Sequence, residues 1–151
     1  MRIVELREGG AALAAPLAEF FRRVKEAGDE ARFHPHPLTP EEAERRVRYE
    51  GRDLYYALTD GDRVLGYGML RGWDEGYAVP SLGIAVHPDE RGRGLARLLM
   101  LFLHGAARKR GAERVRLTVD TDNDAALRLY RELGYAMQAM EDGRLEGILR
   151  L

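Results

Sequence analysis

Hydrophobic positions near the start of the chain recur first with the period of a strand and then with that of a helix. Residues 2–6 alternate between apolar and polar side chains, which predicts a first strand. Residues 11–27 then place their large apolar side chains on one stripe, which predicts an amphipathic helix that Gly28 ends. The chain therefore begins with a strand followed by a helix.

A second helix is predicted directly after the proline-containing segment 33–38. Thr39 can cap its first turn, Pro40 suits the first helical position and Glu42 completes a capping box. We expect this helix to continue to about Glu50. The preceding Phe33–Leu38 stretch holds Pro35 and Pro37, which favour an extended path.

Three strands are predicted in the middle of the chain. Aromatic and β-branched residues flank the turn Asp60-Gly61-Asp62, which predicts a hairpin within residues 53–70. Residues 77–86 are apolar and form the third of these strands. Pro80 lacks a backbone N–H, so we expect this strand to be irregular or at a sheet edge at that position.

The last third of the chain alternates helices with strands. The predicted elements are a helix from Leu95 to about Lys109, a strand at 114–119, a helix after Asp122 and Asn123, and strands at 135–140 and 145–151. The predicted order is thus β-α-α-β-β-β-α-β-α-β-β. No repeat or long linker interrupts it, so we expect residues 1–151 to form one domain.

Composition and charge narrow the function classes. The chain has 151 residues, 45% of them hydrophobic, with a formal net charge of −1 and no cysteine. The charge balance argues against a nucleic-acid or anionic-membrane partner, and the lack of cysteine excludes disulfides and thiolate metal sites. The N-terminal 21 residues carry Glu5, Glu8 and Glu19, unlike a signal peptide or membrane span. We expect a soluble, cytoplasmic protein, monomeric or homodimeric.

The segment HPDERGRGLARLLM, residues 87–100, carries the strongest chemical signal. Gly92 and Gly94 let the backbone pass close to a ligand at the start of a helix, where consecutive N–H groups and the helix dipole favour an anion. Arg91, Arg93 and Arg97 add positive charge there, which favours a pyrophosphate. The alternative is a turn softened by glycine with solvated arginines. Neither a Rossmann fingerprint nor a Walker loop is present.

Two motifs carry a resemblance to a known family. Arg91-x-x-Gly94-x-Ala96, entered from LGIAV and followed by RLLM, resembles the acyl-CoA pyrophosphate loop of the GCN5-related N-acetyltransferases (GNAT). TDNDAALRLYRELGY, residues 121–135, resembles their second motif. The resemblance implies an α/β (α+β) GNAT fold, with a mixed, mostly antiparallel sheet splayed between its fourth and fifth strands. It also implies acetyl-CoA as cofactor.

The resemblance also implies roles for particular residues. Backbone groups of Ile84 and Val86 would bind the pantetheine arm, with the Ile84 N–H also polarising the thioester carbonyl. Asn123 would bind the cofactor arm and Tyr130 would face the departing thiolate as an acid; the alternatives are a plain helix cap for Asn123 and core packing for Tyr130. The pyrophosphate would be held by the amides of Arg91, Gly92, Arg93, Gly94, Leu95, Ala96 and Arg97.

The general base is not settled by the sequence. Members of the family often carry a glutamate on the fourth strand, whereas this chain has Pro80 followed by Ser81 there. We favour Glu75 as the base. The remaining candidates are Asp74, His87, Asp120 and Asp122.

The resemblance also implies an acceptor pocket, because the connection between the first two helices and the loop after the third strand usually form its wall in this family. Aromatic and polar side chains gather in these segments, which suits a small amine. His34 and His36 can equally be ordinary loop residues, and no further ligands are spaced to make them a metal site. The expected pocket residues are Phe33, His34, His36, Trp73 and Tyr77.

Two functions are compatible with these signals. The first is an acetyl-CoA-dependent N-acetyltransferase that acts by direct transfer through a ternary complex on an amino sugar, polyamine, amino acid or peptide N-terminus. The second is a non-catalytic acyl-CoA-binding regulatory domain, which the missing strand glutamate keeps open. Tyr130 favours the first, because binding alone needs no phenol beside the sulfur.

Overall fold

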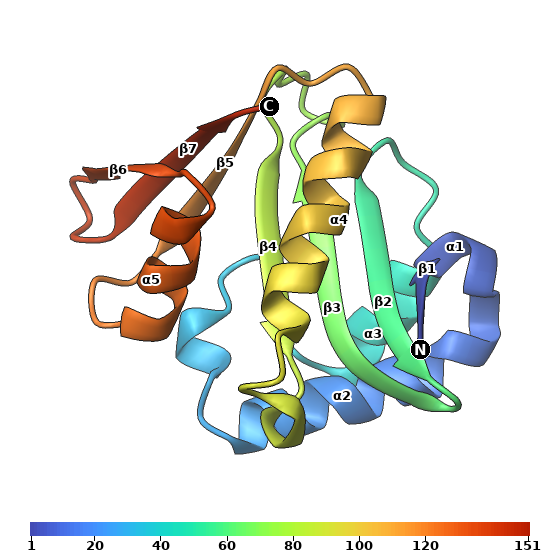
Figure 1. Cartoon of the computed structure of the whole chain (residues 1–151). Helices are drawn as coiled ribbons and strands as arrows, with labels where there is room; N and C mark the ends of the chain where they lie inside the picture. Colours follow the sequence, from blue (N-terminus) through green and yellow to red (C-terminus); the bar gives the residue numbers. More distant parts are fainter.

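Seven short segments pair into one mixed sheet in the computed structural model, which describes residues 1–151 (Figure 1). Their order across the sheet is β1-β2-β3-β4-β5-β7-β6. The fold class and element order predicted from the sequence are confirmed. The strands are β1 (Arg2–Glu5), β2 (Leu54–Asp60), β3 (Arg63–Arg71), β4 (Ser81–Val86), β5 (Arg114–Val119), β6 (Ala136–Ala139) and β7 (Leu145–Arg150).

The parallel pair β4–β5 is the weak point of this sheet. All other neighbouring strands are antiparallel over four or more registered residues, whereas β4 and β5 share the single pair Ser81–Arg116. The Arg116 N–H makes this connection by donating to the Pro80 carbonyl at 3.0 Å. Beyond it the two strands diverge (Figure 1). The predicted splay between the fourth and fifth strands is confirmed.

One long helix covers the face of β3 and β4. Its buried positions include Leu99 and Leu103, and both pack closely over β3 because glycines stand opposite them. A Cβ at Gly66 would come 2.7 Å from Leu99 Cδ1, and one at Gly68 would come 3.0 Å from Leu103 Cδ1. This contact fixes α4 (Leu95–Lys109) against the strand that precedes the splay.

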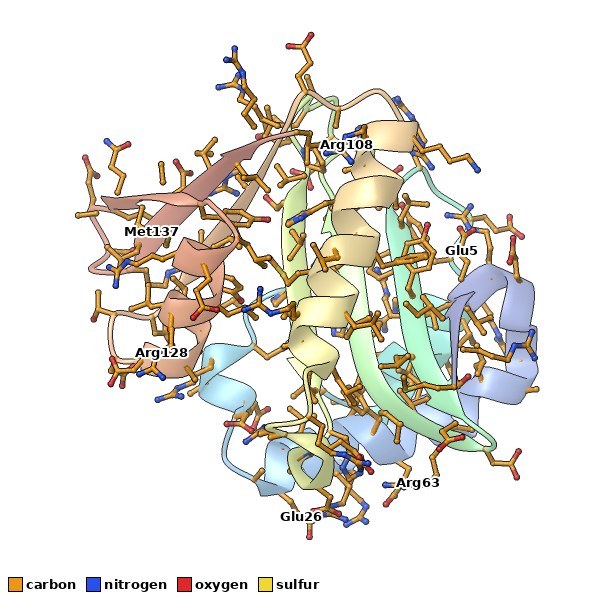
Figure 2. All side chains as sticks on the ribbon, viewed as in Figure 1. Glu5, Glu26, Arg63, Arg108, Arg128 and Met137 are labelled. Atoms are coloured by element: carbon orange, nitrogen blue, oxygen red, sulfur yellow. The ribbon has the colours of Figure 1, made fainter.

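Other helices cover the opposite face of the sheet (Figure 1). Phe20, Phe21 and Leu17 of α2 (Ala14–Glu26) are fully buried there with Tyr67 and Met69 of β3. The helices before β2 are α1 (Leu6–Gly9), η1 (Gly10–Leu13), α2 (Ala14–Glu26), η2 (Glu30–Arg32) and α3 (Pro40–Val47); η3 (Pro88–Glu90) follows β4 and α5 (Asp124–Glu132) follows β5. Charged side chains such as Glu26, Arg63 and Arg128 lie at the periphery (Figure 2).

Several predicted boundaries are wrong by a few residues. The first long helix begins at Ala14, after two short helical turns, and α3 ends at Val47. Thr39 caps α3 by accepting from the Glu42 N–H at 3.1 Å, but the Glu42 carboxylate bonds Arg45 and Arg46 instead of closing the capping box.

The third predicted strand is also shorter than expected. It begins at Ser81, and residues 77–80 precede it as irregular backbone. Pro80 therefore causes no bulge inside the strand. Lacking an N–H, it uses its carbonyl to bond β5 just before the ladder of β4 begins.

No helix has both the length and the apolar run needed to cross a membrane.

Candidate functional site

A cavity of about 1010 Å³ occupies the opening between β4 and β5. One side of its wall is β4, residues 81–86, and the other is β5 with the start of α5. The segment after α2 and the loop after β3 complete it. In Figure 1 the light-blue segment after α2 runs alongside the gap between the two strands. The divergence of the sheet thus produces a site that joins four separate parts of the chain.

The edge of β4 that faces this opening carries unpaired backbone groups. His87 donates its N–H to Leu65 of β3 at 2.8 Å, while the Pro80 carbonyl points the other way, to Arg116 of β5. Backbone groups alternate in direction along a strand, so Ile84 and Val86 direct theirs toward β5. No ladder partner meets them there, because β4 and β5 pair only at Ser81. These groups are available to an extended ligand.

The start of α4 offers a second set of free donors. Leu98 donates to the Gly94 carbonyl at 3.1 Å as the first helical bond, which leaves the N–H groups of Leu95, Ala96 and Arg97 without a partner in the helix. Gly94 is left-handed with φ of 81° and supplies no capping side chain. No atom within 4 Å would meet a Cβ at Gly92 or Gly94, so the space around them is open. The helix dipole makes this end attractive to an anion.

The arginines of this loop are already engaged by carboxylates. Arg91 binds Asp29 of the segment after α2, and Arg97 binds Glu132 at the end of α5. Arg93 pairs with Glu90 at 2.5 Å. Among the three, only Arg91 lines the cavity. The backbone N–H groups are therefore the free anion-binding donors of the loop, and the arginines would have to exchange partners to contribute.

Asn123 and Tyr130 both line the cavity from the α5 side. The Asn123 side-chain oxygen caps α5 by accepting from the Ala126 N–H at 3.4 Å, so its amide NH₂ group stays free to donate. Tyr130 is only 8% exposed, packs against Tyr135 and makes no hydrogen bond through its hydroxyl. Burial raises the pKa of Tyr130 to about 12. The phenol is thus kept protonated throughout the neutral range.

Part of the predicted acceptor pocket lines the same cavity. Phe33 and His34 come from the segment after α2, and Tyr77, which is 63% exposed, comes from the loop after β3. His34 Nε2 lies 3.3 Å from Asp120 Oδ1 at the end of β5, so this pair bridges the two sides of the opening.

Two residues predicted for this pocket lie elsewhere. His36 bonds the Tyr67 hydroxyl at 2.8 Å and packs on Phe21, and burial lowers its pKa. Trp73 is only 6% exposed and lies in the core, with the Arg110 guanidinium 4.7 Å above its ring. Neither side chain lines the cavity. Both rings are held by distant partners, an aromatic cluster and a hydrogen bond for His36 and the apolar core for Trp73, which the loop sequence alone does not reveal.

Of the five candidate bases, only Glu75 and Asp120 line the cavity. Asp74 turns toward α3 and β2, where hydrogen bonds from Tyr49 and from the Arg52 N–H lower its pKa. His87 is buried beside Phe20 and accepts from the Asp89 N–H at 3.1 Å. Asp122 pairs with Arg32 at 3.7 Å on the outside.

The structure adds polar residues that the sequence analysis did not single out. Arg71, Ser81 and Arg116 line the cavity from three adjacent strands. The alternation of Arg116 with buried Val115 and Leu117 is the signal that could have identified its direction. Asp53 is buried and accepts the N–H groups of residues 72–74, which anchors the loop that carries Glu75.

Comparison with known families agrees with this geometry. A model of the acetyltransferase (GNAT) family matches residues 18–135, which include the open sheet edge, the loop and Tyr130. The chain belongs to the GNAT family.

Two curated relatives in this family are acetyltransferases. Acetyltransferase SG1711 of Sodalis glossinidius is 35% identical over 95 residues, which are 63% of this chain and 65% of the relative. Mycothiol acetyltransferase of Rhodococcus jostii is 36% identical over 101 residues, which are 62% of this chain and 33% of the relative. The chain thus matches just under two thirds of one GNAT relative and one third of the other.

A solved GNAT structure supports the fold over the full length. The PaiA N-acetyltransferase of Thermoplasma acidophilum, determined in complex with coenzyme A, has a TM-score of 0.79 to this chain. The alignment covers 100% of both chains at 13% identity. At that identity the likeness concerns the arrangement of the backbone.

Proposed function

We propose that this GNAT protein is an acetyl-CoA-dependent N-acetyltransferase whose acceptor is a primary amine on a small molecule or a peptide N-terminus. The observation that carries the proposal is the arrangement of three features around one opening. An unpaired strand edge and a buried, protonated phenol line the cavity, and a helix N-terminus with free N–H groups follows the cavity-lining Arg91. Family membership and the coenzyme A complex of the Thermoplasma relative support the same cofactor.

The residues present suit such a cofactor at both ends. Three unpartnered N–H groups at α4 and the open space at Gly92 and Gly94 suit a pyrophosphate. The backbone groups of Ile84 and Val86 suit the amide groups of a pantetheine arm, and the free NH₂ of Asn123 faces the same cavity. Acetyl-CoA, when bound, supplies a thioester whose carbonyl carbon accepts the amine.

Two groups of the chain would then assist the transfer: one would stabilise the charge on the carbonyl oxygen, and the other would supply a proton to the leaving thiolate. The Ile84 N–H would stabilise negative charge developing on a carbonyl oxygen, as a fixed donor that needs no reorganisation. Tyr130 would hold on its Oη the proton that a leaving thiolate requires.

Glu75 would take the proton from the amine. It lines the cavity and forms no salt bridge, so its oxygens are free, whereas Asp120 is engaged by His34. The amine would enter past Phe33 and Tyr77, so cofactor and acceptor would occupy the cavity together and transfer would be direct.

Gly94→Glu is expected to abolish acetyl-CoA binding. The new carboxylate would stand at the anion site, and calorimetric titration measures the loss. Gly94→Gln is the matched control, because it introduces a similar side chain and the same left-handed strain without charge. We expect Gly94→Gln to retain measurable affinity. Equal affinity of Gly94→Glu and wild type would contradict the assignment of this loop.

Tyr130→Phe is expected to lower kcat by about 10²- to 10⁴-fold with little change in acetyl-CoA affinity, because the hydroxyl acts only on the leaving group. Steady-state kinetics with thiol detection measures both quantities. Tyr135→Phe is the control. It removes the neighbouring hydroxyl, which lies 2.7 Å from His104 Nε2 and outside the cavity, and it should leave kcat nearly unchanged. If both variants keep wild-type kcat, Tyr130 is a packing residue.

Glu75→Gln is expected to lower kcat and to remove the acidic limb of its pH profile, because a base must be deprotonated to act. Asp74→Asn, which changes the adjacent carboxylate outside the cavity, should leave that profile in place. A normal pH profile in Glu75→Gln, together with loss of the acidic limb in Asp120→Asn, would assign the role of base to Asp120.

Binding of acetyl-CoA with no thiol release for any amine would favour a non-catalytic domain.

A further inference from the structure

One arginine in the cavity differs from the others in its partners. Five arginines line the cavity: Arg32, Arg71, Arg91, Arg116 and Arg144. Four of them form salt bridges: Arg32 with Asp122, Arg91 with Asp29, Arg116 with Glu146 and Arg144 with Asp142. Arg71 forms none, and its guanidinium donates only to the Pro35 carbonyl. Its charge is therefore the one positive charge in the cavity that no carboxylate compensates.

Arg71 lies at the closed end of the opening, away from the N-terminus of α4. It pairs with Ser81 across β3 and β4, and Ser81 pairs with Arg116 across β4 and β5. Directly paired residues point to the same face of a sheet, so these three side chains form a row. Ser81 precedes Val86 by five residues, about 16 Å along the strand. The row is thus too far from the α4 N-terminus to be part of a pyrophosphate site there.

The Ser81 hydroxyl in this row is free to donate a hydrogen bond. Arg116 donates from Nη1 to Ser81 Oγ at 2.6 Å, while its Nε and Nη2 donate to Glu146 at 3.1 and 2.9 Å. Ser81 therefore accepts from Arg116 and has no acceptor for its own O–H in the chain. A hydroxyl can donate one hydrogen bond while it accepts others, so this hydrogen is available to a ligand.

We propose that Arg71 and Ser81 bind a carboxylate on the acceptor, so that the amine acetylated by this protein belongs to an amino carboxylate. This inference rests on the proposed function and narrows its acceptor. A guanidinium presents paired donors that match a carboxylate, and the Ser81 hydroxyl adds one more.

The charge balance favours a carboxylate over a phosphate ester. A phosphate ester carries about −1.5 to −2 at neutral pH, more than the single charge of Arg71 compensates. Glu75, four residues after Arg71, also lines the cavity without a salt bridge. A free cation and a free carboxylate in one cavity complement an acceptor that carries both charges.

Direct binding tests the carboxylate site without requiring turnover. L-amino acids and short ω-amino acids, each beside its primary amide, are titrated calorimetrically into the protein with and without saturating coenzyme A. We expect at least one acid to bind about tenfold or more tightly than its amide, and Arg71→Gln to remove that difference. Arg114→Gln is the matched control, because Arg114 is an exposed β5 arginine outside the cavity with no salt bridge; it should retain the difference.

Ser81→Ala provides a second variant that leaves Arg71 and its bond to Pro35 in place. It should reduce the preference for the acid by several-fold, and it decides the matter if Arg71→Gln does not fold. The proposal is overturned if no acid binds better than its amide, or if the preference survives in the folded Arg71→Gln and Ser81→Ala variants.

Thiol release from acetyl-CoA with the same compounds separates this result from the proposed function. Turnover of amides as fast as acids, with no preference in binding, refutes the carboxylate site and leaves the acetyltransferase standing. Carboxylate binding that depends on Arg71, without thiol release for any amine, refutes the acetyltransferase and leaves the site standing.

Discussion

The short contact between β4 and β5 is the constraint on which the site depends. The strands pair only around Ser81 and Arg116, and past that point the inner edge of β4 has no strand beside it. Unpaired backbone groups inside a protein cost free energy unless water or a ligand satisfies them. A sheet that opens in its middle therefore has donors and acceptors available that an uninterrupted sheet would use for its own ladder.

The remaining elements hold this opening in shape. Gly66 and Gly68 let α4 lie close on β3, which brings the α4 N-terminus to the open end of β4. Asp53 ties down residues 72–74, which places the following loop at the closed end. The opening consequently has two chemically different ends: free backbone N–H groups at the start of α4, beyond the cavity-lining Arg91, and the side chains of Arg71 and Ser81 near the junction of the strands.

Local patterns explain why the sequence predicted the conformation of the 91–97 loop and the Asn123 cap but not the placement of Trp73 and His36. The loop at 91–97 and the helix cap at Asn123 depend on glycine conformations and capping residues, which are short-range signals. The positions of Trp73 and His36 depend on side chains that are distant in the sequence. Trp73 packs in the core beneath α4, and His36 packs against Phe21 and Tyr67. A loop sequence does not specify such long-range packing.

The boundary errors have a similar cause. Residues 77–80 are apolar, which predicts a strand, but the β3–β4 ladder extends only from Arg71–Ser81 to Gly66–Val86.

The uncompensated charge of Arg71 can be identified only when the partners of all five cavity arginines are known. The alternation of β5 signals the direction of Arg116, whereas its pairing with Glu146 requires the register of β7.

The central claim is that the open edge of β4 binds the acetyl-CoA arm through its backbone. Residue-resolved amide hydrogen exchange by NMR tests this most directly, because neighbouring residues of β4 provide their own control. We predict that acetyl-CoA slows exchange at Ile84 and Val86, whose N–H groups face the opening, and changes little at Gly83 and Ala85, which face β3. Saturating acetyl-CoA that leaves exchange at Ile84 and Val86 unchanged would contradict the account.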